Sequence, residues 1–160
     1  MNFENNLIID ILKSRKQEIT VDYFFRIPNK EKEAVEFICT DMSYTFKLLL
    51  KLYFPNSTLL IDHFHVIKYI NDQLNNTRIR VMRKYASNKK SLEYRLLKHR
   101  YKLLLKSRND IDLETFKYDN ILEHYVTENI ILEQLLNCDE ELRQAYNAKE
   151  EYLIFDQVTQ

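Results

Sequence analysis

Hydrophobic and polar positions follow two different periodicities along the first part of the chain. The runs at residues 35–40 and 57–61 are rich in apolar and β-branched residues and predict two strands, which end at Asp41 and Asp62. Between them, leucines recur at helical spacing until Phe54-Pro55-Asn56 ends the helix; these are Leu48, Leu49 and Leu52. Two strands joined through a helix run parallel, so both aspartates are expected at one carboxyl edge of a sheet.

The residues before this strand–helix–strand unit predict one more strand and one helix. The run at residues 7–12 reads as a short strand, and a helix is expected from Ser14 to about Phe25. Pro28-Asn29 ends that helix, and a charged link at residues 30–33 leads into the central unit.

After His65 the pattern changes to helical spacing. A long helix ending near residues 86–88 is predicted by apolar positions that share one face: Ile67, Ile70, Leu74, Val81 and Tyr85. A second helix, at about residues 91–106, is expected to bury four leucines: Leu96, Leu97, Leu103 and Leu104.

The last fifty residues are also predicted to be helical. Short helical pieces are expected at residues 112–125, and no stretch after Asp62 alternates in the way a strand does. Thr127 is placed to N-cap a helix through Leu136, and Asp139 one through about Phe155. The predicted fold class is therefore α/β but mostly helical: a partial sheet of about three strands in residues 1–66, then an all-helical segment in residues 67–160.

Composition narrows the setting of this domain. No apolar run is long enough to cross a bilayer, and the polar, acidic start does not read as a signal peptide. Two cysteines, Cys39 and Cys138, are too few for a disulfide framework, so we expect a reduced, cytoplasmic protein. The 160 residues include no glycine, so turns must use Asn, Asp and Pro.

The balanced net charge hides a strong asymmetry. Residues 68–108 carry 13 Lys and Arg against two acids, Asp72 and Glu93, a local charge of +11. A basic stretch of this kind predicts either a nucleic-acid contact or a solvated helix face. The candidate DNA-binding residues lie on the two predicted helices of this stretch: Arg78, Arg80, Arg83, Lys84, Lys98, Arg100 and Lys102.

Asp41 is the first residue with candidate chemistry. At a strand end before Met42-Ser43 it could N-cap the next helix, which is common for Asp at such a junction. It could also be a metal carboxylate, because a rigid oxygen ligand at a strand end suits Mg²⁺ or Mn²⁺ in phosphodiester chemistry.

Asp62, His63 and His65 form the second candidate group. Asp-His-x-His at a strand end could bind zinc or iron, yet no nearby Cys or His completes a set of four ligands. The simpler interpretation is that Asp62 caps the long helix and His65 packs in its first turn. We favour this interpretation over a structural zinc site.

These motifs together resemble the DDE transposases of ISL3-type bacterial insertion sequences. The likeness rests on Asp41-Met42-Ser43-Tyr44, Phe54-Pro55-Asn56, Ile61-Asp62-x-Phe64-His65 and Arg78-x-x-x-Met82. It extends outward through segments upstream and downstream of these motifs: Asp10-Ile11-Leu12-x-Ser14-Arg15, Leu97-Lys98-x-x-Tyr101 and Leu142-x-x-x-Tyr146. The resemblance covers nearly all of the chain.

The resemblance implies an RNase H-like catalytic core, interrupted by a helical insertion, that cuts and joins DNA with Mg²⁺ or Mn²⁺ held by an Asp, Asp, Glu triad. It places Asp41 as the second acid and metal ligand of that triad, with Asp62 and His65 as supporting active-site residues. Asp62 as the second acid is the alternative assignment. The family more often has Arg after this aspartate, where this chain has His63.

By the same resemblance, the first Asp and the Glu of the triad have no counterparts here. The expectation is an internal transposase fragment, inactive alone, whose partners are transposon-end DNA and a second copy or a complementing transposase chain, with no membrane. The alternative from another class is a non-catalytic helical module that binds DNA or protein through its basic helices.

Overall fold

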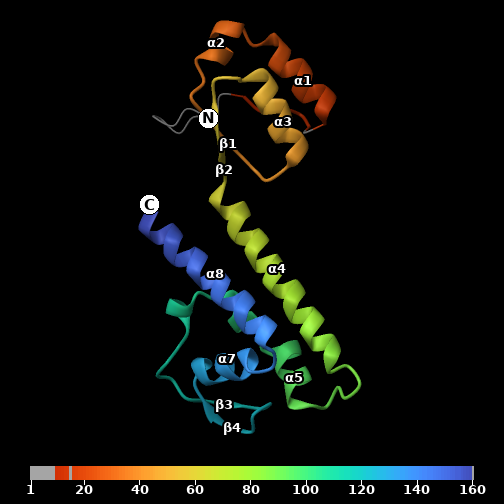
Figure 1. Cartoon of the computed structure of the whole chain (residues 1–160), viewed down its shortest axis with the longest axis vertical. Helices are drawn as coiled ribbons and strands as arrows, with labels where there is room; N and C mark the ends of the chain where they lie inside the picture. The colour runs from red at the N-terminus through yellow and green to blue at the C-terminus, as the bar shows by residue number, and fades with distance from the viewer. Residues whose placement is uncertain (1–9, 15, 160) are drawn as a thin grey trace. The chain divides into compact units, whose positions relative to one another are not determined.

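The computed structural model describes residues 10–14 and 16–159, and it is mostly helical, with 60% helix and 10% strand (Figure 1). This confirms the α/β, mostly helical prediction, but the strands form two small sheets and do not establish an RNase H-like sheet. The chain divides into two compact units, residues 1–66 and 67–160. None of the described helices is both long and apolar enough to cross a membrane.

The first unit contains the predicted strand–helix–strand arrangement. Its elements are α1 (Gln17–Arg26), α2 (Asn29–Glu33), β1 (Phe37–Thr40), α3 (Tyr44–Tyr53) and β2 (Thr58–Ile61). Strands β1 and β2 pair in parallel, with Phe37 opposite Thr58 and Thr40 opposite Ile61. Of the strand expected at residues 7–12, residues 7–9 lie outside the described residues, and residues 10–12 are not in a strand.

The small core of this unit is aromatic and aliphatic. Phe24 of α1 meets Phe54 edge to face, with ring centroids 5.1 Å apart, and Leu49 and Leu50 of α3 are buried beside them. Leu48 and Leu52, which recur at helical spacing with Leu49, are 52% and 74% exposed. The predicted helix is present, and it packs against α1 through the face that Leu49 and Leu50 occupy.

The second unit is built around α4 (His63–Lys84), which begins at the end of the first unit. It continues with α5 (Leu92–His99), α6 (Lys102–Leu105), a 3₁₀ turn (Arg108–Asp110), α7 (Glu128–Leu136) and α8 (Glu140–Thr159). The single helix predicted at residues 91–106 is in fact two, separated at Arg100-Tyr101, although all four of its predicted leucines are buried. Thr127 accepts a hydrogen bond from the Ile130 N–H, so the predicted cap of α7 is confirmed.

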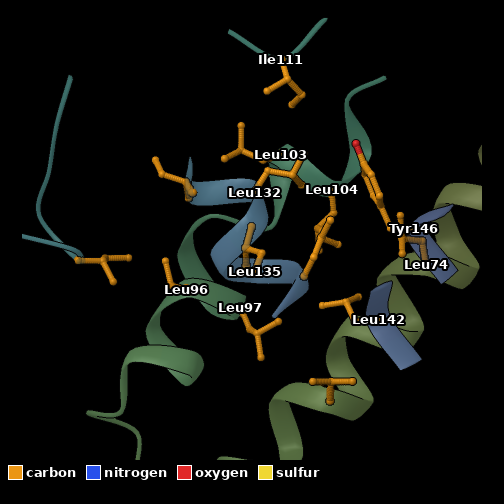
Figure 2. Packing of buried hydrophobic residues seen from close by; sticks show 14 of the residues in the cluster. Leu74, Leu96, Leu97, Leu103, Leu104, Ile111, Leu132, Leu135, Leu142 and Tyr146 are labelled. Carbon is orange, nitrogen blue, oxygen red and sulfur yellow. The ribbon is translucent and has the colours of Figure 1, made fainter. Parts of the chain in front are cut away.

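The core of the second unit is a continuous leucine-rich cluster (Figure 2). Leu74 and Val81, on the predicted apolar face of α4, belong to this cluster together with Leu142 and Tyr146 of α8. The other contributions come from α5, α6 and α7: Leu96, Leu97, Leu103, Leu104, Leu132, Leu135 and Leu136.

A hairpin of two strands, β3 (Lys117–Asp119) and β4 (His124–Val126), replaces the helical pieces expected at residues 112–125. The all-helical prediction for this segment was therefore wrong. The Asp119 carboxylate closes the turn by accepting hydrogen bonds from the N–H groups of Ile121 and Leu122. Glu123, at φ 61°, then takes the left-handed conformation that a glycine would normally supply. Strands of three residues are too short to show a periodicity of two in the sequence.

Two buried cations satisfy helix-end carbonyls in the second unit. Arg78 donates from Nη1 to the Leu97 carbonyl near the end of α5, at 2.8 Å. Lys149 donates from Nζ to the Leu104 carbonyl at 2.9 Å and also to the Lys106 carbonyl, just after α6. The last carbonyls of a helix have no partner within the helix, and here side chains from α4 and α8 supply the donors.

The leucine cluster gives a direct test of this packing. Leu97 is fully buried, so Leu97→Ala is expected to lower the free energy of unfolding by about 2–5 kcal/mol through lost contacts and a cavity. Leu113, which is 65% exposed, is the matched control, and Leu113→Ala is expected to change the free energy of unfolding by about 0.5 kcal/mol or less. Urea unfolding followed by circular dichroism measures both; equal losses would contradict the observed core.

Candidate functional site

The carboxyl ends of β1 and β2 form the rim on which the candidate acids lie. The Asp62 N–H donates to the Thr40 carbonyl at 2.9 Å, which continues the parallel ladder by one residue past β2. Asp41 and Asp62 therefore leave adjacent strands at the same rim. They line one hollow with four other residues of the first unit: Cys39, Thr40, Phe46 and His65.

Asp41 shapes the turn between β1 and α3. Its Oδ1 accepts a hydrogen bond from the Ser43 N–H at 3.0 Å, and Ser43 is the N-cap residue of α3. Asp41 thus precedes the cap position, and its bond holds the turn rather than capping the first turn of the helix. The side chain is half-buried, at the mouth of the hollow.

Asp62 caps the long helix, as one of the two sequence interpretations predicted. Its Oδ1 accepts from the Phe64 N–H at 2.9 Å, and its carbonyl accepts from the His65 N–H at 3.0 Å. The other carboxylate oxygen lies 3.9 Å from His65 Nε2. The cap therefore orients the carboxylate and keeps the imidazole beside it in the first turn of α4.

The rim carries two carboxylates whose chemistry can be compared with that of a metal site. Carboxylate oxygens are the ligands that Mg²⁺ and Mn²⁺ prefer, and Asp41 and Asp62 are carboxylates held by backbone N–H groups at the ends of paired strands. Across residues 10–14 and 16–159, however, no group of three or more His, Cys, Asp and Glu side chains is close enough to hold a metal ion. The donor chemistry fits a hard cation, but the described set is incomplete.

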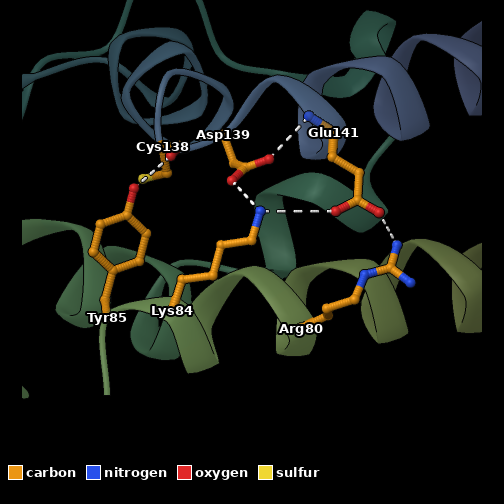
Figure 3. A network of polar contacts seen from close by, with 6 residues as sticks. All are labelled: Arg80, Lys84, Tyr85, Cys138, Asp139 and Glu141. Atoms are coloured by element: carbon orange, nitrogen blue, oxygen red, sulfur yellow. Dashed lines mark hydrogen bonds and ion pairs between the residues drawn. The ribbon is translucent and has the colours of Figure 1, made fainter. Parts of the chain in front are cut away.

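Much of the basic stretch is neutralised by acids from later in the chain. Figure 3 shows Lys84 of α4 bound to Asp139 at 2.7 Å and Arg80 bound to Glu141, both acids at the start of α8. The Asp139 Oδ1 in turn accepts from the Glu141 N–H at 3.0 Å, which confirms its predicted position at the start of α8. Arg80 and Lys84, both candidate DNA contacts, thus hold α4 against α8.

Three further ion pairs neutralise other cations of residues 68–108. Arg100 binds Asp119 at 2.6 Å, Lys106 binds Glu128 at 2.6 Å, and Arg108 binds Glu133 at 3.0 Å. Over the whole second unit, 16 basic residues face 15 acidic ones, so the local charge of +11 becomes a unit charge of +1. The charge of residues 68–108 taken alone overestimates the positive charge of the folded unit, because the acids that neutralise these cations are distant along the chain.

Arg78 is buried, with 8% of its surface exposed. Its guanidinium donates to the Asn75 side chain and the Leu97 carbonyl, each at 2.8 Å, and lies 4.7 Å from the Tyr101 ring centroid. Burial lowers the pKa of this guanidinium. We therefore assign Arg78 to the packing of α4 against α5. The helical spacing of Leu74, Arg78 and Val81 could have placed it on the apolar face.

Seven cations of the stretch remain exposed or half-exposed without an ion pair among the residues that the structure describes. Three were candidate DNA contacts, Arg83, Lys98 and Lys102, and Lys98 lies 5.8 Å from the Tyr94 ring centroid. The other four were not among the candidate DNA contacts: Lys68, Lys89, Lys90 and Arg95, which donates to the Asn120 carbonyl at 3.1 Å. Lys89 and Lys90 lie in the exposed loop between α4 and α5. Only the positions of the folded helices show that these two lysines are available, because no sequence motif marks them.

Comparison with known proteins yields one match. A family model described as Transposase (DDE_Tnp_ISL3) matches residues 1–159. No curated protein and no solved structure matches the chain.

The Arg100–Asp119 pair predicts a pH-dependent stability. Burial raises the pKa of the Asp119 carboxyl, but hydrogen bonds from the Leu122 N–H and Arg100 outweigh burial and hold the pKa below its ordinary value. A depressed pKa contributes stability above about pH 4, and that stability is lost as the pH falls further. Asp119→Asn should therefore cost about 1–3 kcal/mol at pH 7, and the difference should shrink below about pH 4.

Thermal unfolding between pH 3 and pH 7 measures this difference. The exposed carboxylate of Glu114 gives the control, since Glu114→Gln should leave the unfolding temperature nearly unchanged at both pH values. A cost for Asp119→Asn that is constant across this range would show that the charge of Asp119 does not matter.

Proposed function

The chain belongs to the ISL3-type DDE transposase family, and from that membership we propose that its first unit carries part of a metal-dependent DNA strand-transfer site. The family generally uses a divalent metal and acts on DNA. The observation that carries the proposal is the parallel β1–β2 pair, which delivers Asp41 and Asp62 to one rim beside His65. We also propose a cytoplasmic setting, where such a protein would meet its DNA.

Asp41 is the proposed metal ligand of this rim. It follows β1 directly, and the Ser43 N–H fixes one of its carboxylate oxygens at 3.0 Å, so that the group is oriented before any cation arrives. Mg²⁺ or Mn²⁺ bound there would supply Lewis-acid stabilisation of phosphate oxygens. The order of the carboxylate matters because a preorganised ligand loses less conformational entropy on binding.

Asp62 and His65 are proposed as supporting residues. The helix cap at the start of α4 holds the Asp62 carboxylate, and the carboxylate lies 3.9 Å from His65 Nε2. This arrangement can orient the imidazole and add negative charge to the rim. Because Asp62 lies next to Asp41 across the ladder, Asp62 as the second triad acid is kept as the alternative assignment.

We propose that this chain does not cleave DNA by itself. Two-metal phosphodiester chemistry needs carboxylates converging from several elements, whereas the described residues bring only Asp41 and Asp62 to this rim. The remaining acids would come from residues beyond those that the structure describes. The first unit would then be part of the catalytic core, with residues 67–160 as its helical insertion.

A second candidate function is supported by the second unit. It has a leucine core of its own and a set of exposed cations that includes Arg83, Lys89 and Lys90. Such a unit can bind duplex DNA through phosphate contacts whether or not the acidic rim is active. DNA affinity without cleavage is the expected behaviour of the chain if both proposals hold.

The acidic rim is tested with purified chain, transposon-end DNA and Mg²⁺ or Mn²⁺. We expect the DNA to remain uncut, and metal-dependent cleavage that Asp41→Ala abolishes would overturn the incompleteness argument. Mn²⁺ should still broaden the NMR amide signals near residues 39–41 and 62–65 selectively. Asp41→Asn should reduce that broadening, whereas Asp22→Asn, at an exposed carboxylate paired with Arg26 in the same unit, should not.

The exposed cations are tested by a salt titration of affinity for duplex DNA. If Arg83, Lys89 and Lys90 each neutralise one phosphate, replacing all three with Gln should reduce the slope of log K against log salt by about 3. Replacing the exposed Lys30 and Lys51 of the first unit with Gln serves as a charge control. Absence of binding at low salt would show that these cations are only a solvated face.

A further inference from the structure

The β3–β4 hairpin presents an aromatic pair to solvent. Tyr118 and Tyr125 are directly opposite each other in the antiparallel register, with ring centroids 5.5 Å apart and planes at 69°. They are 54% and 67% exposed, and Phe116 just before β3 is 62% exposed. Because side chains alternate along a strand, both tyrosines lie on the face opposite the buried Asp119 and Val126. Two tyrosines of the hairpin and the adjacent Phe116 thus present three large rings to solvent.

A cationic hollow lies at the other face of the hairpin, lined by Asp119 and Val126, and Tyr118 is also among its lining residues. Its floor is apolar, formed by Leu103, Val126 and Ile131. The polar lining is mostly basic and comes from α5, α6, the following loop and β3: His99, Arg100, Lys102, Lys106 and Lys117. Exposed aromatic rings and cations therefore lie on the two faces of one short hairpin.

The two carboxylates in this hollow are already neutralised. Asp119 accepts from Arg100 at 2.6 Å and from two backbone N–H groups, while Glu128 accepts from Lys106 and from the Asp112 N–H. The hydrogen bond from Lys106 lowers the pKa of Glu128, so this carboxylate stays charged and paired. Lys102 and Lys117 make no ion pair with any other residue of the described chain. The hollow thus keeps a net positive charge for an external anion.

We propose that the hairpin and the adjoining hollow bind single-stranded DNA, with bases stacked on Tyr118 and Tyr125 and phosphates on Lys102 and Lys117. The inference rests on the proposed DNA-directed function and specifies which form of DNA this surface takes. Base stacking on exposed aromatic rings beside cations is the general mode of single-strand binding. In a duplex the base faces are covered by their neighbours, so the rings would have no matching surface. An apolar protein partner would match the rings but leave the two lysines desolvated without counter-ions.

The test is fluorescence anisotropy with a labelled oligothymidylate of about 12 nucleotides, next to a duplex of equal length. The double variant Tyr118→Leu/Tyr125→Leu keeps apolar bulk but removes the aromatic faces. It should weaken oligothymidylate binding about tenfold or more while leaving duplex binding unchanged. Tyr118→Trp/Tyr125→Trp should retain the single-strand affinity, and Lys102→Gln/Lys117→Gln should lower its salt slope by about 1.4.

Folding of each variant is checked by thermal unfolding, and a second measurement uses wild-type protein alone. Oligonucleotides carrying 5-iododeoxyuridine should crosslink to Tyr118 or Tyr125, identified by peptide mass spectrometry. Unchanged oligothymidylate binding in the leucine variant, or crosslinks only outside the hairpin, would overturn the inference. If the wild-type protein binds the duplex but not oligothymidylate, this inference is refuted. If it binds neither, the proposed function of the second unit is refuted as well.

Discussion

The second unit depends on two buried cations that complete helix ends in a chain without glycine. Helices commonly end with a glycine in the left-handed conformation, which lets backbone N–H groups satisfy the last carbonyls. Here Arg78 from α4 donates to a carbonyl near the end of α5, and Lys149 from α8 donates to carbonyls at the end of α6. Burial lowers the pKa of both side chains, and hydrogen bonds compensate for their removal from water. These contacts fix how the four helices meet around the leucine core.

The same use of charge for internal contacts changes the interpretation of the basic stretch. Arg80 and Lys84 attach α4 to the start of α8, and Arg100 holds the hairpin through Asp119. Surface ion pairs contribute little to stability individually, but each one removes a cation from the field that DNA would experience. The cations available to a polyanion are therefore concentrated at the α4–α5 loop and beside the β3–β4 hairpin. Duplex affinity and single-strand affinity are then properties of different parts of one unit.

In the first unit, backbone pairing between strands, and not ion pairing, positions the candidate site residues. Parallel pairing of β1 with β2 brings Asp41 and Asp62 to one rim, and each carboxylate is oriented by a backbone N–H group two residues later. His65 follows from the cap of α4 because one helical turn brings residue 65 beside residue 62. The rim is thus ordered by local hydrogen bonds, while completion of a metal site depends on carboxylates beyond those that the structure describes here.

The sequence alone determined the features that depend on local order: the parallel strands before Asp41 and Asp62, the apolar faces of α4 and α5, and the caps of α7 and α8. Short-range periodicity and capping chemistry specify these elements before any distant contact forms. Tertiary structure decided which face of α3 is buried, which cations remain available, and that residues 117–126 form a hairpin. Each of these features depends on contacts between residues far apart in the chain, such as the Arg100–Asp119 pair, or on the local hydrogen bonds of one turn. A periodic sequence pattern encodes neither.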